Sequence, residues 1–168
     1  MIAMFDIDGV LVNIDHRLKY LRNKDYDRFY STEELSKDTI IRNGDNLLKA
    51  MRNEDVYFVT SRPERCRKDT EKFLEALCSL DGVKFSSDRL YMRSNGDFRP
   101  SSVVKPELVE KLMKDVEKDP FFTSDAHGVF IDDMYENIKA IRRKFPTIAG
   151  LTFDATEIKS TEGKVSIV

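Results

Sequence analysis

The sequence has 168 residues, of which 40% are hydrophobic and 35% are charged, and its formal net charge is -2. This length and apolar content suit one domain built around one core, with a small appendage. The slightly acidic balance argues against a protein that coats long stretches of nucleic acid, because such proteins are usually basic. It leaves room for a local basic pocket that binds one phosphate or one strand end.

No apolar run approaches the roughly 20 residues that a membrane-spanning helix needs. The first residues, MIAMFDIDG, lack a basic start and reach Asp6 too early for a secretion signal. The two cysteines, Cys66 and Cys78, form no pattern that suggests zinc, and we expect both to be reduced thiols. These features predict a cytoplasmic protein with no membrane partner.

Short apolar runs alternate with amphipathic helical patterns along the chain. In chain order they predict a strand at 2–5, a polar insertion at 13–43, a helix at 45–51, a strand at 56–59, a helix at 64–80, a strand at 90–92, a helix that starts at Pro106, a strand at 129–131, a helix at 135–145 and a strand at 151–153. We interpret the insertion, which mixes charged and aromatic residues, as a small helical segment within a single domain spanning 1–168.

The alternation of strands and helices predicts the α/β class, with a five-stranded parallel sheet, helices on both faces and a small helical cap insertion. Ligands bind such sheets outside the carboxyl ends of the strands. Polar residues follow three of the predicted strands directly: Asp6, Thr60 and Asp132. We therefore expect these side chains to share one site.

The motif Asp6-Ile7-Asp8-Gly9 follows the first predicted strand. Two carboxylates this close repel each other unless a cation neutralises them, and oxygen ligands favour Mg²⁺. One carboxylate can then attack phosphorus while the other moves a proton. The alternatives are an ordinary polar turn and a calcium loop, but the preceding strand and the lack of a Glu-terminated twelve-residue loop weaken the calcium interpretation.

The second motif places Thr60, Ser61 and Arg62 between a strand and a helix. A hydroxyl group and a helix start favour an anion, and Arg62 could bind a phosphate through two hydrogen bonds. Taken alone, the motif fits a simple helix cap better.

Two further positions carry charge that could serve the same site. Lys105 could neutralise a carboxylate or a phosphate, although a single lysine is more often a solvated surface residue. Asp132 and Asp133 end an apolar strand, where both can reach a cation. A helix cap with an acid in its first turn explains that pair equally well.

The order of these motifs, an acid pair, a hydroxyl, a lysine and a second acid pair, resembles that of the haloacid dehalogenase (HAD) superfamily of phosphotransferases. The resemblance covers nearly the whole chain. An aspartate at the second acid position, here Asp8, is typical of the phosphatase members.

A closer resemblance is to the 3'-phosphatase domain of phage-type polynucleotide kinase/phosphatases and its stand-alone phage relatives. It rests on DHR at 15–17, DYDRF at 25–29, SRPE at 61–64, LYMR at 90–93, GDFRP at 96–100 and VK at 104–105. It implies substrate-binding roles for Arg17, Ser61, Arg62 and Asp97, with Ser61 and Val10 departing from the usual glycine and threonine. The sequence has no GxxxxGK[ST] loop, so we expect no kinase half.

The resemblance implies a mechanism. Asp6 attacks phosphorus and forms an aspartyl-phosphate, while Asp8 protonates the leaving oxygen and later deprotonates water. The implied Mg²⁺ ligands are Asp6, the backbone carbonyl of Asp8, Asp132 and Asp133. Thr60 and Lys105 are implied to bind phosphoryl oxygens.

Three substrate hypotheses remain. The first is a 3'-phosphatase acting on polynucleotide ends, without extended duplex binding. The second is a 5'(3')-(deoxy)ribonucleotidase for free mononucleotides, whose base would stack on aromatics of the insertion: Tyr20, Tyr26, Phe29 and Tyr30. A small apolar core beneath the insertion explains those aromatics somewhat better. The third is a catalytically silent nucleotide-binding module, which the full set of reactive groups disfavours.

Overall fold

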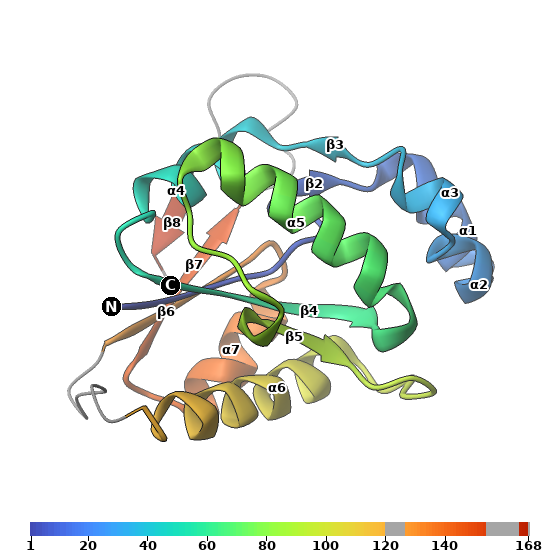
Figure 1. Ribbon diagram of the computed structural model, residues 1–168. Helices are drawn as coiled ribbons and strands as arrows, with labels where there is room; N and C mark the ends of the chain where they lie inside the picture. The colour runs from blue at the N-terminus through green and yellow to red at the C-terminus, as the bar shows by residue number, and fades with distance from the viewer. Residues whose placement is uncertain (120–126, 154–164, 168) are drawn as a thin grey trace.

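The computed structural model describes residues 1–119, 127–153 and 165–167. Its main sheet has the order β5-β4-β1-β6-β7-β8, and the elements are drawn in Figure 1. The strands are β1 (Ile2–Phe5), β4 (Asp55–Pro63), β5 (Leu90–Arg93), β6 (Gly128–Asp132), β7 (Ile148–Phe153) and β8 (Val165–Ile167). The first five of these run parallel, which confirms the predicted five-stranded parallel sheet. Strand β8, which pairs antiparallel with β7, was not predicted from the sequence.

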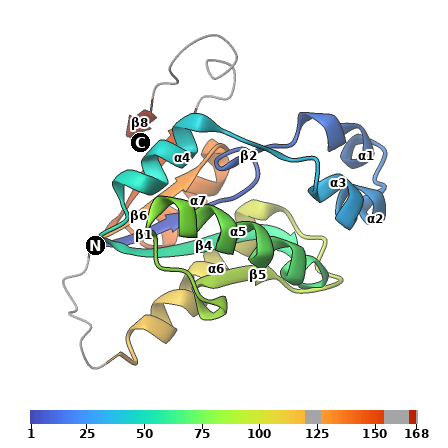
Figure 2. The ribbon, with the colours of Figure 1, turned by 45° about the horizontal axis from the view of Figure 1, so that its top comes forward.

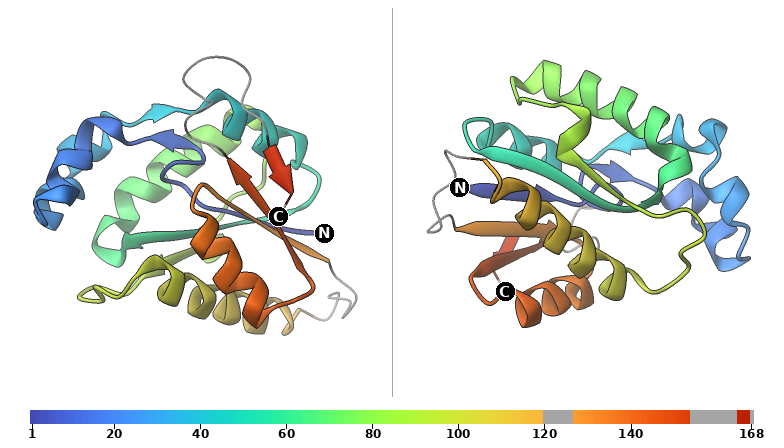
Figure 3. Two further views of the ribbon diagram at one scale, coloured as in Figure 1. Left: turned by 180° about the vertical axis from the view of Figure 1, so that it is seen from behind. Right: turned by 60° about the horizontal axis from the view of Figure 1, so that its bottom comes forward.

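Helices cover both faces of the sheet, as Figures 1 and 3 show. One face packs against α4 (Arg42–Ala50) and α5 (Arg67–Asp81), and the other against α6 (Ser101–Val116) and α7 (Tyr135–Lys144). Alternate residues of β1 serve the two cores. Phe5 packs in the first cluster and Met4 in the second, and both are fully buried. A central strand that is apolar throughout therefore fits a sheet buried on both sides.

The segment between β1 and α4 forms the insertion. Its elements are β2 (Val12–Asn13), the 3-10 turn η1 (Asp15–Arg17), α1 (Leu18–Arg22), α2 (Tyr26–Phe29), α3 (Thr32–Leu35) and β3 (Thr39–Ile40). Strands β2 and β3 pair antiparallel and close the segment at its base. The side chains of Asp25 and Ser31 cap α2 and α3 by accepting hydrogen bonds from backbone N–H groups. Figures 1 and 2 show the three helices projecting past the carboxyl ends of the central strands.

One predicted helix start is wrong. Helix α6 begins at Ser101, with Pro100 as its N-cap, and Pro106 lies inside it. Proline is favoured in the first turn because the missing N–H has no partner there, and Pro100 occupies that end of the helix. Pro106 instead sits in the second turn, where it removes one hydrogen bond near the helix start. Lys105 consequently lies within the helix rather than at its mouth.

Two other helices also differ from the predicted bounds. Helix α5 starts at Arg67, after a 3-10 turn η2 (Glu64–Cys66), and α4 starts at Arg42.

Among the described residues, no helix has both the length and the apolar character that a membrane span requires.

Candidate active site

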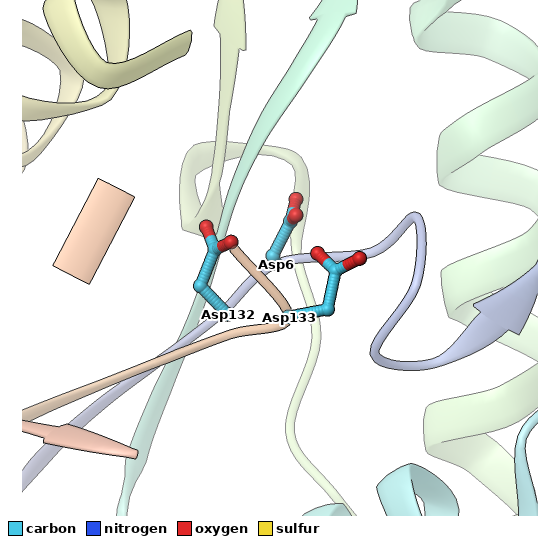
Figure 4. Close-up of side chains that lie close together, drawn as sticks. All are labelled: Asp6, Asp132 and Asp133. Carbon is cyan, nitrogen blue, oxygen red and sulfur yellow. The ribbon is translucent and has the colours of Figure 1, made fainter. Parts of the chain in front are cut away.

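Three carboxylates meet at the carboxyl ends of β1 and β6. The register pairs Phe5 with Ile131, so Asp6 and Asp132 follow at neighbouring positions of adjacent strands. Asp133 comes next, and one oxygen atom of each carboxylate lies within 4.8 Å of the other two. Figure 4 shows the three side chains gathered at this edge of the sheet. The parallel sheet thus brings together two predicted motifs that are far apart in the sequence.

Gly9 allows the chain to turn away from this cluster. Its φ is +85°, which L side chains rarely adopt, and a Cβ atom there would overlap the carboxylate of Asp133. Two features therefore require glycine at position 9: the left-handed backbone conformation and the close approach of the Asp133 carboxylate.

Lys105 is the cation in direct contact with the cluster. Its Nζ lies 2.6 Å from Asp6 Oδ2 and 2.5 Å from Asp132 Oδ2, and its side chain is 2% exposed. Burial by itself would lower the pKa of Lys105, but the two carboxylates outweigh burial and raise that pKa. Lys105 is therefore held as an ammonium ion.

Asp132 is oriented from α7. Asn137 Nδ2 donates to both of its oxygens, at 3.0 and 3.1 Å, and the backbone N–H of Met134 donates to Oδ1 at 2.8 Å. Asn137 was not predicted as a site residue. It lies in the first turn of α7, and an asparagine there after an acid pair is common, so the sequence gives no signal for its role.

The electrostatics of the cluster favour a divalent cation. Burial raises the pKa of Asp6 well above its ordinary value despite Lys105, and burial together with Asp132 raises the pKa of Asp133 to about 7. When all three carboxylates are ionised, the Lys105 ammonium leaves two negative charges uncompensated within the part of the chain that the structure describes. Oxygen ligands and a deficit of two positive charges fit Mg²⁺. Asp6, Asp132 and Asp133 are therefore the residues able to hold it.

The second acid of the motif has a different environment. Asp8 Oδ1 accepts from Arg62 Nη2 at 2.5 Å and from Arg17 Nη2 at 2.8 Å. Burial would raise the pKa of Asp8, but the two guanidinium groups outweigh burial and lower it. Its side chain is not part of the three-carboxylate cluster. The motif therefore presents one acid to the cation site and one to two arginines.

Asp38 completes this arrangement and was missed by the sequence analysis. It accepts from Arg17 Nε at 2.8 Å through Oδ1 and from Arg62 Nη2 at 2.8 Å through Oδ2. The side chains of Asp38, Arg17 and Arg62 are 4%, 0% and 3% exposed. We call Asp8, Arg17, Arg62 and Asp38 the arginine network. It joins the insertion, which carries Arg17 and Asp38, to the end of β4, which carries Arg62.

We expect Asp38→Asn to lower the free energy of unfolding by about 3 kcal/mol or more, because removing one partner of a buried ion pair leaves a charge uncompensated. Urea unfolding at neutral pH measures the effect. The matched control is Asp27→Asn, which removes the carboxylate of an exposed pair with Arg65. Exposed pairs contribute little, so the control should unfold at nearly the urea concentration of the unaltered protein. If both variants lowered the urea midpoint of unfolding by the same small amount, the arginine network would not contribute to stability as expected.

A pocket of about 550 Å³ opens over the cluster, between the insertion and the loop after β5. Most of the residues predicted for the site line it: Asp6, Asp8, Thr60, Ser61, Asp97, Lys105 and Asp133. The others, Arg17, Arg62 and Asp132, are buried. Direct contact of Arg17 or Arg62 with a substrate phosphate stays a prediction.

Ser61 and Asp97 make local contacts in this structure. Ser61 Oγ donates to Ser101 Oγ at 2.9 Å, which ties the end of β4 to the start of α6. The Asp97 carboxylate accepts from the backbone N–H and the guanidinium of Arg99. Their predicted contact with substrate is compatible with their place in the pocket wall.

Residues 1–127 match the family model described as the phosphatase domain of the polynucleotide kinase PNKP. The chain belongs to this family. Membership confirms the resemblance to HAD-type phosphatases and supports a phosphatase function for the chain. The matched segment includes Asp6, Asp8, Thr60 and Lys105 but ends just before β6. The place of Asp132 and Asp133 in the site therefore rests on the structure.

Two solved structures share the fold of this PNKP-type phosphatase. One is a chain of a Pnkp1/Rnl/Hen1 complex, with a TM-score of 0.59 and 18% identity over 89% of this chain and 44% of that one. This chain thus spans less than half the length of that protein. The other is a putative phosphatase from Clostridium difficile, with a TM-score of 0.59 and 14% identity over 89% of this chain and 82% of that one. No curated protein matches the sequence.

Proposed function

We propose that this chain is a Mg²⁺-dependent phosphomonoesterase that removes the 3'-phosphate from polynucleotide ends through an aspartyl-phosphate on Asp6. The observation that carries the proposal is the separation of the two acids of one motif. Asp6 lies with Asp132, Asp133 and Lys105, whereas Asp8 pairs with the two arginines of the arginine network. Both acids line the same pocket. The membership in the PNKP phosphatase family supports the choice of a polynucleotide end.

In the first step, an oxygen of Asp6 attacks phosphorus, and the bond between phosphorus and the 3'-oxygen breaks as that oxygen takes a proton from Asp8. Water then attacks the phosphorus of the aspartyl-phosphate and gives its proton to Asp8. The bond between phosphorus and the Asp6 oxygen breaks, which restores the Asp6 carboxylate and releases phosphate. Thr60 and Lys105 hold phosphoryl oxygens throughout. Asp6, Asp132, Asp133 and the backbone carbonyl of Asp8 would hold Mg²⁺, which would supply positive charge beside the transferring phosphoryl group.

The arginine network serves this proton exchange by fixing the orientation of Asp8. In the substrate-free structure the two arginines favour ionised Asp8, the form that accepts the proton of water. A phosphate bound beside Asp8 adds negative charge, which raises the pKa of its carboxyl group and favours the form that donates a proton.

Four substrates of matched composition test the proposal. Phosphate release is measured with a 3'-phosphorylated oligonucleotide, its 5'-phosphorylated twin, and the 3'- and 5'-mononucleotides, each with Mg²⁺ and with the metal removed by a chelator. We expect Mg²⁺-dependent release with the highest kcat/KM on the 3'-phosphorylated oligonucleotide. Preference for the mononucleotides would favour the nucleotidase alternative, and no release from any of the four would contradict both.

A further inference from the structure

The pocket extends beyond the groups that the phosphoryl reaction uses. Its volume of about 550 Å³ lies in the range of ~300–1,000 Å³ typical of pockets for small organic ligands, far more than a phosphate group requires. Its outer part is lined by apolar side chains from two sides, Leu21 and Tyr26 on the insertion and Phe98 on the loop after β5. Phe98 is 74% exposed and Leu21 39% exposed. Large apolar side chains left open at the mouth of a reaction pocket favour contact with a ligand.

Tyr26 and Phe98 both line the pocket, and their rings contact each other. Their ring centroids lie 5.6 Å apart with an interplanar angle of 46°. They come from segments separated by more than seventy positions, so the pair forms only when the insertion and the loop lie together. The pair therefore marks a place where two parts of the protein meet over the reaction site.

The loop that presents Phe98 is held from both ends. Arg93 donates to the backbone carbonyls of Asp97 at 3.1 Å and Arg99 at 2.5 Å, and to the carbonyl of Ser61 at 3.0 Å. These bonds fix the loop to the end of β4 next to Thr60. The exposed ring of Phe98 is thus carried by an anchored loop.

Tyr26 is also anchored, by Arg65 in the turn η2 before α5. Arg65 donates to its backbone carbonyl at 3.1 Å, and pairs with Asp27 at 2.6 Å. The other aromatics predicted as stacking candidates behave differently. Phe29 is buried and contacts Tyr30 edge-on at 4.6 Å, which is the small core beneath the insertion that the sequence also suggested. Tyr26 alone of these four contacts Phe98 at the pocket mouth.

We propose that Tyr26 and Phe98 form a subsite for the terminal nucleobase of the substrate strand, the base of the nucleotide whose phosphate reaches Asp6. The proposal rests on the proposed function, since a nucleobase lies near the scissile phosphate only in a nucleotide or strand end. Every base offers a π-face, so stacking on these rings tolerates any sequence. Lys24, which lines the same pocket, suits a neighbouring phosphodiester.

The test compares two ligands that differ in one base. Both are the same 5'-fluorescein oligonucleotide with a 3'-phosphate, and the terminal nucleotide carries thymine in one and is abasic in the other. Binding in Mg²⁺ buffer is measured by anisotropy with Asp6→Asn, which prevents turnover. Adding Phe98→Ala should weaken binding of the thymine ligand by roughly 5- to 150-fold, the range found for removing one stacking aromatic. The abasic ligand should lose several-fold less affinity, and Phe98→Tyr should retain most of the affinity for thymine.

Leu80→Ala is the matched control, because Leu80 is 81% exposed on α5 and does not line the pocket. It should leave both dissociation constants unchanged. An equal loss for the two ligands in Phe98→Ala, or no loss for either, overturns the base subsite. If the unaltered protein releases no phosphate from the thymine oligonucleotide but the base-dependent loss of binding persists, the proposed function fails while the subsite stands.

Discussion

Asp6→Asn is expected to lower kcat for phosphate release by a factor of roughly 10⁴ or more, because removal of a catalytic nucleophile has effects of that size or larger. The amide oxygen of asparagine is a poor nucleophile, so no covalent phosphoenzyme can form. Neither Asp132 nor Asp133 can substitute, since Lys105 and Asn137 hold the first and Gly9 packs against the second.

The same variant should keep or increase stability. The raised pKa of Asp6 means that its ionised form is disfavoured in the folded protein, mainly by burial. Replacing this carboxylate with a neutral amide removes repulsion from Asp132 and Asp133. A loss of activity with unchanged or higher resistance to urea is the pattern expected of a reactive group that is maintained at a cost in stability.

Two measurements check the variant. Steady-state phosphate release gives kcat, and acid quenching with a substrate labelled at the terminal phosphate shows whether label stays on the protein. Asp55→Asn is the control, because Asp55 begins β4 at the opposite end of the strand from Thr60 and its side chain is 67% exposed. Activity of Asp6→Asn within tenfold of the unaltered protein would contradict nucleophilic attack by Asp6.

The sequence predicts the main sheet and the reactive edge because both follow from local patterns. Strand β1 is apolar at every position and is followed by Asp6, and β6 is apolar until its last residue, Asp132, which Asp133 follows. The carboxyl ends of parallel neighbours lie at one edge, so a polar residue directly after each strand predicts a shared site. The location of Lys105 next to Asp6 was predicted by family resemblance and not by the helix bounds, which were wrong.

The partners of buried polar groups could not be predicted, because they depend on how distant segments pack. Asp38 lies in a polar insertion where acids are frequent, and its role is visible only once Arg17 and Arg62 converge on it. The sequence identifies both arginines as site residues but cannot show that Asp8 is what they bind. The different surroundings of the aromatic residues in the insertion could not be predicted for the same reason. Phe29 points into a small core, and Tyr26 points to a loop that comes much later in the chain.

Lys105→Met is expected to lower kcat/KM by a factor of roughly 10² to 10³, the effect of losing one group that stabilises charge in the transition state. The thioether cannot donate to a phosphoryl oxygen, and it leaves Asp6 and Asp132 without the ammonium that now contacts both. The variant should also need less Mg²⁺ for half-maximal activity, because three carboxylates without the competing ammonium attract the ion more strongly.

Stability measurements separate the charge effect from catalysis. In metal-free buffer, Lys105→Met should lower the free energy of unfolding by about 3 kcal/mol or more, since Lys105 is one partner of a buried ionic cluster. Excess Mg²⁺ should restore part of this loss, because an ion that binds only the folded protein stabilises it. Lys114→Met is the control on the same helix, where the lysine side chain is 69% exposed. Urea unfolding of both variants, with and without Mg²⁺, gives the comparison.

Urea unfolding of Lys105→Met in metal-free buffer also tests whether the site needs a divalent cation for charge balance. A cation is needed for charge balance only if Asp6, Asp132 and Asp133 carry more negative charge than Lys105 can balance. If Lys105→Met unfolds at the same urea concentration as the unaltered protein in metal-free buffer, the carboxylates must already be protonated in part. The deficit of two positive charges would then not exist in the resting protein, and Mg²⁺ would have to bind for reasons other than charge balance.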